Sequence, residues 1–420
     1  MADDWLIAPD SPGARSGRPP ARPTALMWLR VRYRLAPWWV RVLAVFLLSR
    51  VVTTALLLAK AAGQPANAWT DASPGYFDFA SIWDGRWYYI IAVSGYPDQL
   101  PMTADGHVAE NAWAFMPVFP LLARVVMLLT GLDFPVVAPI LSVVFAAATA
   151  VVFYMLMAQL LPAGTAMFAV VLYCFAPLSP LLQVSYAESM HAFFLTLALY
   201  LLVRRQYWLL VPAVIVVSLT RPGGLAFALA LGLHVVYRLV RRRAEPFPWR
   251  ERVAAGTATL AALVSGFAWV VVAGLITGVP TAYTDTELAW RSAYVGHEAF
   301  TPFVGWVQGA NFWVPQLPWG PVLLVVAIML VAVLLFSPAV KRLGVDVRLW
   351  LASYLLYVLA VFFPQSSTFR ILFPVFPALG ALAQPRSPVY RVGIVLVFIA
   401  LQWGWIHIAW WVDGVDWTPP

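Results

Sequence analysis

The chain has 420 residues, of which 62% are hydrophobic and only 11% charged, and its mean hydropathy is +0.79. Soluble domains carry about 25% charged residues, so this composition excludes a soluble protein and indicates an all-α polytopic membrane protein. The formal net charge of +8 comes from arginines gathered in a few connecting segments, which is typical of membrane topology and not of a nucleic-acid surface.

The N-terminal part of the chain sets the predicted orientation in the membrane. Residues 1–37 hold no apolar run and are rich in Pro, Gly, Ala and Arg, so they are expected to be disordered. Residues 15–41 contain seven arginines and no acidic residue, which places this end in the cytoplasm by the positive-inside rule. A first membrane helix is expected at residues 38–61, because this apolar run is long enough to cross.

The next stretch, residues 63–134, is predicted to be an external loop. Between residues 63 and 116 it contains six acidic residues and one arginine, Arg86, and an acidic loop after an arginine-rich terminus is external. Two short amphipathic helices, near residues 76–93 and 112–130, are expected to lie in the membrane interface. If the second one crossed the membrane, the later arginine clusters would all fall outside, against the positive-inside rule.

Long apolar runs predict the remaining membrane helices. With the first, they give about eleven spanning helices in a single transmembrane domain, residues 38–411. Residues 279–319 form the second predicted external loop, and residues 412–420 an external tail. Prolines interrupt several helices, and broken helices at membrane depth normally line a cavity. The expected spans are residues 135–160, 165–179, 187–203, 206–221, 223–240, 253–278, 320–337, 349–364, 370–384 and 389–411.

One carboxylate is placed unusually on the predicted external face. Asp84 lies among aromatic residues in the stretch 83–89 (Trp-Asp-Gly-Arg-Trp-Tyr-Tyr), at the expected membrane surface. A carboxylate in this setting can serve as a base or as a ligand. The alternative is an incidental acid within an interfacial aromatic belt, and the local sequence leaves both interpretations open.

Further polar residues fall on the same predicted face near helix ends, where charges are costly and are usually retained for a site. Arg221 and Arg370 are expected to bind a phosphate, because a guanidinium group matches phosphate oxygens. The alternative for each arginine is an interfacial anchor whose charged end reaches the membrane surface. Glu188 has a structural ion pair as its alternative. The candidate substrate-binding residues are Trp83, Arg86, Tyr88, Glu110, Asn111, Tyr186, Glu188 and Gln365.

No cofactor and no metal ion are expected. The sequence has no His, Cys or Asp spacing typical of zinc or iron, and it has no Walker motif or other glycine-rich phosphate loop. His191, one helical turn beyond Glu188, is expected to pack and not to bind metal. The single cysteine, Cys174, excludes an intrachain disulfide and is expected to be a small buried hydrophobe.

Several stretches resemble the PIG-V type of mannosyltransferases, in the order in which that family has them. Residues 82–96 contain its Trp-Asp-Gly, aromatic pair and Gly-Tyr, and residues 110–121 contain an acid before an aromatic and proline-rich run. Residues 185–189 (Ser-Tyr-Ala-Glu-Ser) are similar to its Tyr-Ser-Glu-Ser, and residues 219–224 (Leu-Thr-Arg-Pro-Gly-Gly) to its Thr-Arg-Ser-Asn-Gly. Residues 370–377 are similar to its Arg…Pro…Pro ending.

The resemblance implies the GT-C class of membrane glycosyltransferases, which take a polyprenyl-phosphate sugar as donor and invert the anomeric carbon. It implies Asp84 as the catalytic base and places the counterparts of Glu110, Glu188, Arg221 and Arg370 around the pocket. Two arginines can neutralise a monophosphate leaving group without a metal. The acceptor stays open, because the chain departs from the family's pattern at Met116, Ala187, Pro222 and Gly223.

The function expected from the sequence is transfer of one sugar, with mannose the first choice, to a lipid, glycolipid or glycan acceptor outside the cytoplasm. The arginine-rich composition, with lysine only at Lys60 and Lys341, is typical of a bacterial protein, here of the plasma membrane and in contact with its lipids. Three alternatives stay open: arabinofuranose or glucose as the donor sugar, a transporter or flippase of lipid-linked sugars, and a non-catalytic membrane scaffold.

Overall fold

The computed structural model describes residue 32, residues 35–316 and residues 318–412, and these residues contain helices and no β-strand. The all-helical prediction is therefore confirmed. The chain divides between residues 41 and 42, and the fold described below is that of the part from residue 42 onward. The predicted disordered N-terminus (1–37) and external tail (412–420) lie almost entirely outside the described residues.

The first half of the fold runs from α2 to α10. In chain order its helices are α2 (Trp38–Ala61), α3 (Tyr76–Phe79), α4 (Asp84–Ser94), η1 (Ala112–Ala114), α5 (Val118–Thr130), α6 (Phe134–Leu160), α7 (Ala163–Phe175), η2 (Ser179–Gln183), α8 (Glu188–Val203), α9 (Tyr207–Thr220) and α10 (Gly224–Val240). The closest packing in this half is between α6 and α8 and between α8 and α9.

The second half runs from α11 to η4. Its helices are α11 (Trp249–Thr277), α12 (Ala282–Ala289), α13 (Ser292–Val295), α14 (Val304–Trp313), α15 (Trp319–Leu335), α16 (Pro338–Lys341), α17 (Gly344–Val361), α18 (Thr368–Ile371), η3 (Phe373–Ala378), α19 (Leu379–Leu382), α20 (Pro388–Trp405) and η4 (Ile406–Trp410). α11 packs along both α9 and α10, and α17 packs along α10.

Within the described residues, five helical stretches are long and apolar enough to cross a membrane: α2, α6, α11, α17 and Pro388–Trp410. Shorter apolar helices, among them α7 to α10 and α15, accompany them. The chain is therefore an integral membrane protein, although these lengths do not fix the predicted count of about eleven spans. The single helix predicted over residues 370–384 is wrong. Three short pieces (α18, η3 and α19) replace it, because Pro374 and Pro377 interrupt the helical hydrogen bonds.

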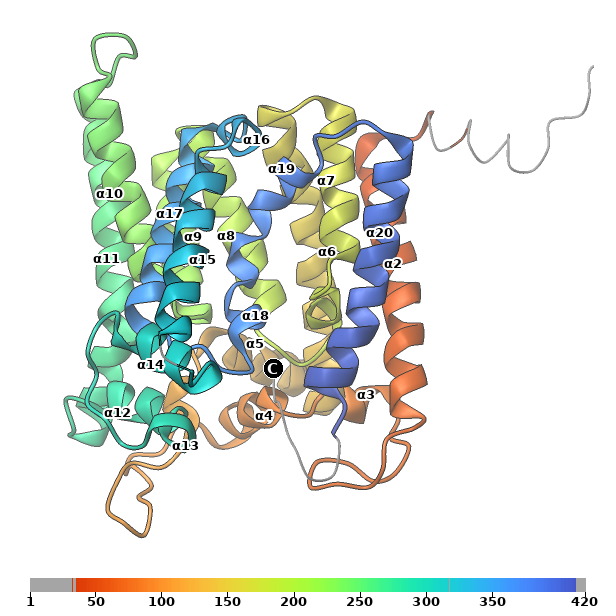
Figure 1. Cartoon of the computed structure of the whole chain (residues 1–420), viewed down its shortest axis with the longest axis vertical. Helices are drawn as coiled ribbons and strands as arrows, with labels where there is room; N and C mark the ends of the chain where they lie inside the picture. The colour runs from red at the N-terminus through yellow and green to blue at the C-terminus, as the bar shows by residue number, and fades with distance from the viewer. Residues whose placement is uncertain (1–31, 33–34, 317, 413–420) are drawn as a thin grey trace, which may run out of the picture. The chain divides into compact units, whose positions relative to one another are not determined.

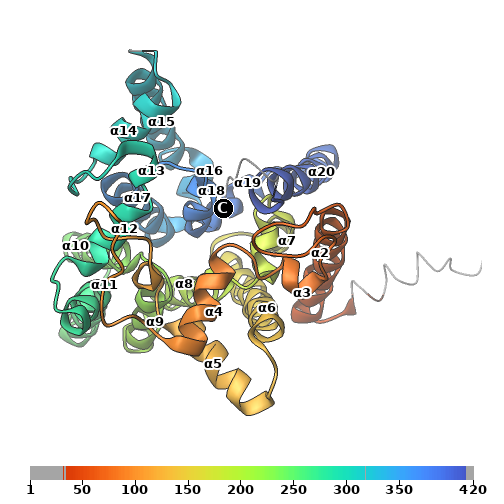
Figure 2. The ribbon, with the colours of Figure 1, turned by 90° about the horizontal axis from the view of Figure 1, so that it is seen from below.

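The first loop supplies helices that lie across one end of the bundle. Seen along the bundle, α4 and α5 appear lengthwise, whereas α10 and α11 appear nearly end on (Figure 2). α5 buries Phe119 and Ala123, while Leu128 and Leu129 are 77% and 81% exposed. An exposed apolar surface on such a helix is what the membrane interface requires. This placement agrees with the interfacial position expected for this helix.

A buried arginine holds the irregular segment between α7 and α8. Arg50, in the middle of α2, donates hydrogen bonds to the carbonyl oxygens of Cys174 and Ser179, each at 3.0 Å, and to Gln183 Oε1 at 2.9 Å. Backbone groups left without partners at membrane depth are costly, and this guanidinium group satisfies them. Arg50 thereby fixes the stretch that leads into Tyr186 and Glu188. Cys174 is fully buried, as expected.

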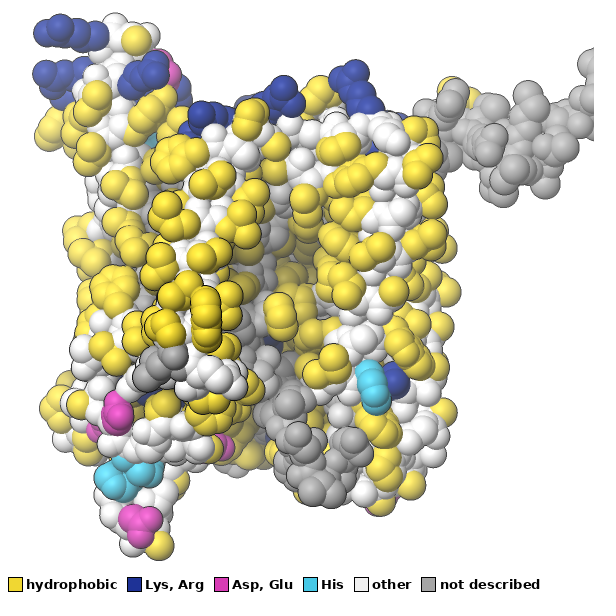
Figure 3. Space-filling model, in the orientation of Figure 1, with side chains coloured by type: hydrophobic (Ala, Val, Ile, Leu, Met, Phe, Trp, Pro, Cys, Tyr) yellow, Lys and Arg dark blue, Asp and Glu magenta, His cyan; other side chains and the backbone are white. Residues whose placement is uncertain are grey.

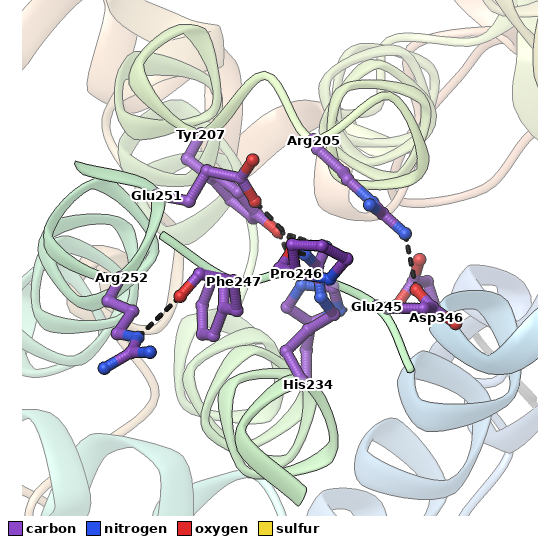
Figure 4. Close-up of polar contacts among 10 residues, drawn as sticks. Arg205, Tyr207, His234, Glu245, Pro246, Phe247, Glu251, Arg252 and Asp346 are labelled. Carbon is purple, nitrogen blue, oxygen red and sulfur yellow. Dashed lines mark hydrogen bonds and ion pairs between the residues drawn. The ribbon is translucent and has the colours of Figure 1, made fainter. Parts of the chain in front are cut away.

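A polar network ties α9, α10, α11 and α17 together at the opposite end of the bundle from α4 (Figures 1 and 4). His234 Nδ1 lies 2.6 Å from Asp346 Oδ1, and His234 Nε2 lies 3.0 Å from the Tyr207 hydroxyl. Arg238 donates to Glu251 Oε2 at 3.2 Å. Figure 3 shows Lys and Arg side chains gathered along this same end, which separates the arginine-rich connections from the end that carries α4 and α12.

Candidate active site

The start of α4 is built to hold Asp84 in a fixed place. Trp83 has φ +55°, an uncommon conformation for a residue with a side chain, and its buried indole donates to Trp410 O at 3.1 Å. A Cβ on Gly85 would lie only 3.3 Å from Ser185 Cβ, so this close approach favours glycine. Asp84 then begins α4 beside the segment that carries Tyr186, whose hydroxyl accepts a hydrogen bond from the Asp84 N–H at 3.3 Å.

Four charged side chains from four elements form one continuous chain of ion pairs. Arg370 of α18 donates through Nη1 to Asp84 Oδ2, and its Nε lies 3.6 Å from Glu188 Oε1. Arg221, which follows α9, donates to the same Glu188 oxygen at 2.6 Å. All four were predicted site residues, and the structure brings them together although Asp84 and Arg370 are 286 positions apart.

The network is largely withdrawn from solvent, and its charges balance. The side chains are 12% exposed for Asp84, 9% for Arg370, 13% for Arg221 and 1% for Glu188. Buried charges are tolerated only when they are paired, and here two guanidinium groups face two carboxylates. The Arg370 guanidinium also lies 5.2 Å from the centre of the Tyr186 ring, a cation–π contact. Glu188 Oε2 has no hydrogen-bond partner among the described residues.

A cavity of about 280 Å³ opens beside this network. Two predicted site residues, Arg221 and Gln365, line it. Its volume lies just below the range of roughly 300–1,000 Å³ for small-molecule sites. The other polar side chains on its wall are Ser218, Tyr283, Thr284, Glu287, Arg291, Tyr354 and Tyr357.

Glu287 is a site candidate that the sequence analysis missed. It belongs to α12 in the second predicted external loop, where Tyr283, Glu287 and Arg291 follow one another at intervals of four residues. That spacing places Tyr283 and Glu287 on one face of α12, while Arg291 follows two residues beyond its end, and this signal could have identified Glu287. Burial by the surrounding protein raises the pKa of Glu287 to about 7, although the side chain remains accessible from the cavity.

The other predicted site residues do not belong to the ion-pair network, and each makes contacts of its own. Tyr88 is buried and packs edge-on against Phe115, each ring centre 5.3 Å from the other. Asn111 links the two predicted external loops, because its side-chain amide donates a hydrogen bond to Thr286 Oγ1 at 2.9 Å. Arg86 is exposed and donates to Trp69 O at 2.5 Å, outside the ion-pair network.

Glu110 and Gln365 keep polar groups available. Glu110 is exposed at the end of the first loop, and partial burial together with the charge of Asp84 raises the pKa of its carboxyl. Gln365 donates through Nε2 to Ser367 Oγ at 3.3 Å, and its Oε1 has no hydrogen-bond partner within the described part of the chain. Among the described residues no group of three or more His, Cys, Asp or Glu side chains is arranged to hold a metal ion.

Comparison with protein-family models gave no match, and comparison with curated proteins gave none either. Among solved structures, the chain is similar to one titled "Crystal Structure of ArnT from Cupriavidus metallidurans in the apo state", at 16% sequence identity and a TM-score of 0.46. The similarity covers 84% of this chain and 61% of that chain, so this chain spans less than two thirds of that protein's length. A similarity of this size says nothing about activity.

Proposed function

We propose that the chain is an inverting membrane glycosyltransferase of the GT-C class. It transfers one sugar, with mannose the first choice, from a polyprenyl-phosphate donor to a lipid, glycolipid or glycan acceptor. The observation that carries the proposal is the ion-pair network itself: Asp84 at the start of α4 pairs with Arg370, and Glu188 links Arg370 to Arg221 at the edge of a cavity. The resemblance of the same residues to the PIG-V motifs supports this assignment.

In the proposed reaction Asp84 is the general base. Its carboxylate takes the proton of an acceptor hydroxyl, and the resulting oxygen nucleophile attacks the anomeric carbon of the donor. The bond between that carbon and the phosphate oxygen breaks with inversion, and polyprenyl phosphate leaves with the electron pair. Arg221 and Arg370 stabilise the negative charge that develops on the leaving phosphate.

The ion pairs of the ligand-free protein indicate how donor binding would change the contacts of Arg370 and Asp84. In the free protein Arg370 is bound to Asp84 and also lies near Glu188, so its charge is shared between two carboxylates. A donor phosphate competes for this guanidinium group and weakens its hold on Asp84. An ion-paired carboxylate has its oxygens occupied, so donor binding frees the Asp84 carboxylate to receive a hydrogen bond, and then the proton, from the acceptor hydroxyl.

The proposed site faces away from the cytoplasm. α4 and α12 lie at the end of the bundle opposite α16 (Figure 1), and Lys and Arg side chains gather along that opposite end (Figure 3). The positive-inside rule assigns arginine-rich connections to the cytoplasm, so the network and its cavity belong to the external face. A polyprenyl donor reaches that face within the lipid, and the acceptor approaches from the loop side.

The test uses purified protein in nanodiscs with polyprenyl-phosphate mannose labelled in the sugar. Release or transfer of the label is followed for the wild type and for Asp84→Asn. Loss of a general base typically lowers the rate by a factor of about 10²–10⁴, so turnover should fall by at least about 100-fold, while the variant remains folded and still binds donor.

Asp285→Asn is a suitable control, because Asp285 bonds to Thr281 on an exposed part of α12 and does not line the cavity. Turnover by Asp84→Asn equal to that of the wild type would refute the base assignment. Donor binding by both proteins without turnover of mannose, glucose or arabinofuranose donors would instead support a transporter of lipid-linked sugars.

A further inference from the structure

We infer that Glu287, on α12, binds hydroxyl groups of the donor's sugar and thereby helps to choose which sugar is transferred. The inference rests on the proposed function and names a residue outside the ion-pair network. It extends the site to the second predicted external loop, whose α12 helix forms the cavity wall that also includes Arg221.

The geometry first shows that Glu287 shares a cavity with one member of the ion-pair network, Arg221. Glu287 and Arg221 line the same cavity, and Tyr283, one turn earlier on α12, is a hydrogen-bonding partner of the Glu287 carboxyl. The charges that act on this carboxyl come from Arg221, Asp84 and Arg370. No ion pair joins Glu287 to an arginine or lysine among the described residues, so its carboxyl is available to a ligand.

The cavity's other side chains favour a carbohydrate over a purely apolar ligand. Tyr354 and Tyr357 of α17 face the space from one side, and Trp290 and Tyr283 from the α12 side. Aromatic faces combined with a carboxylate and an amide group suit a sugar ring, which presents C–H groups on its faces and hydroxyls at its rim. Gln365, with a free Oε1, adds an acceptor to the same wall.

Covalent connectivity indicates that the sugar in this cavity belongs to the donor and not to the acceptor. In the proposed donor the sugar is bonded directly to the phosphate. A phosphate bound by Arg221 therefore places the sugar next to that arginine. Arg221 lines this cavity, whereas Asp84 does not. The donor sugar therefore occupies the cavity, and the acceptor hydroxyl approaches from the side of Asp84.

The position of α12 is fixed by the first loop. Asn111 donates to the buried Thr286 Oγ1 at 2.9 Å, and Trp269 of α11 donates to Trp113 O at 3.0 Å. Thr286 precedes Glu287, so the bond from Asn111 holds α12 against the segment that follows Glu110, and the bond from Trp269 holds that segment against α11. A binding group positioned before the ligand arrives loses less freedom on binding. Asn111 thus acts as a positioning residue for Glu287.

The experiment measures how much affinity the sugar adds. Dissociation constants are determined in nanodiscs for a short-chain polyprenyl phosphate and for the same compound carrying mannose, glucose or arabinofuranose. The ratio of the two constants is the sugar increment, and it is compared in the wild type, Glu287→Gln and Asp285→Asn. Charge-assisted hydrogen bonds are about twice as strong as neutral ones, so Glu287→Gln should lower the increment by roughly tenfold or more and leave binding of the sugar-free phosphate unchanged.

Each outcome is decisive. A lower increment in Glu287→Gln, with a wild-type increment in Asp285→Asn, supports the inference. An unchanged increment in Glu287→Gln, or a wild type in which the sugar adds no affinity, overturns it, while turnover of the donor keeps the transferase proposal intact. A wild type that binds neither compound refutes the proposed function, and this inference with it.

Discussion

Replacement of Glu188 by glutamine tests whether the ion-pair network is a charge-balanced phosphate site. Glu188 is 1% exposed, and one of its oxygens lies 2.6 Å from Arg221 and 3.6 Å from Arg370. The substitution keeps the shape of the side chain and removes the charge that both arginines share. Removing one partner of a buried pair costs about 3–5 kcal/mol, so we expect a loss of this size in the free energy of unfolding of the ligand-free protein.

Glu245→Gln provides the matched control. Glu245 also pairs with an arginine, Arg205, at 2.6 Å, but the two side chains are 37% and 46% exposed. Exposed pairs are worth about 0.2–1 kcal/mol. Although the N–O distance is the same in the two pairs, Glu245→Gln should therefore lower the free energy of unfolding much less than Glu188→Gln. Unfolding is followed by titration with SDS in mixed micelles.

The same variant should respond more strongly to a donor phosphate. A bound phosphate replaces the charge that Glu188→Gln removes, so polyprenyl phosphate should stabilise this variant more than it stabilises the wild type, and bind it about tenfold more tightly or better. Equal unfolding losses in Glu188→Gln and Glu245→Gln, or weaker phosphate binding by Glu188→Gln, would refute the proposed charge balance.

Two further predictions concern single groups in the site. Tyr186→Phe removes the hydroxyl that accepts from the Asp84 N–H but keeps the ring under Arg370, so it should cost about 1 kcal/mol of stability and lower kcat about tenfold or less; a loss as large as that of Asp84→Asn would contradict this. Because burial raises the pKa of Glu287 to about 7, its carboxyl is mostly neutral below that pH and ionised above it. The sugar increment should therefore rise from about pH 6 to about pH 8 in the wild type and stay flat in Glu287→Gln; parallel profiles would contradict the assignment.

The long helices were predictable because hydrophobic length alone determines them. The apolar run predicted at 135–160 is found as Phe134–Leu160, and the run predicted at 223–240 as Gly224–Val240. The run at 370–384 is equally apolar, yet it breaks into three pieces. Its prolines were visible in the sequence, but whether a proline kinks or ends a helix depends on what neighbouring elements supply to the freed backbone groups.

The candidate site was predictable as a set of residues but not as an arrangement. Charged residues near the ends of apolar segments identified Asp84, Glu188, Arg221 and Arg370. The pairing of Asp84 with Arg370 was not predictable, because it joins α4 to a short helix near the end of the chain through tertiary packing alone. Glu287 was missed because its segment was treated as loop, so the helical spacing of its neighbours was not considered.

The ion-pair network also explains why acceptor activation should depend on the donor. Without substrate, two carboxylates and two guanidinium groups neutralise one another, so neither Asp84 nor Glu188 is free of an arginine. A donor phosphate adds one negative charge, and the arginines must then divide their hydrogen bonds between the phosphate and the carboxylates. Asp84 is the more exposed of the two carboxylates and is held by one arginine, whereas Glu188 is in reach of both. The carboxylate released on donor binding is therefore Asp84, the one placed to accept a proton.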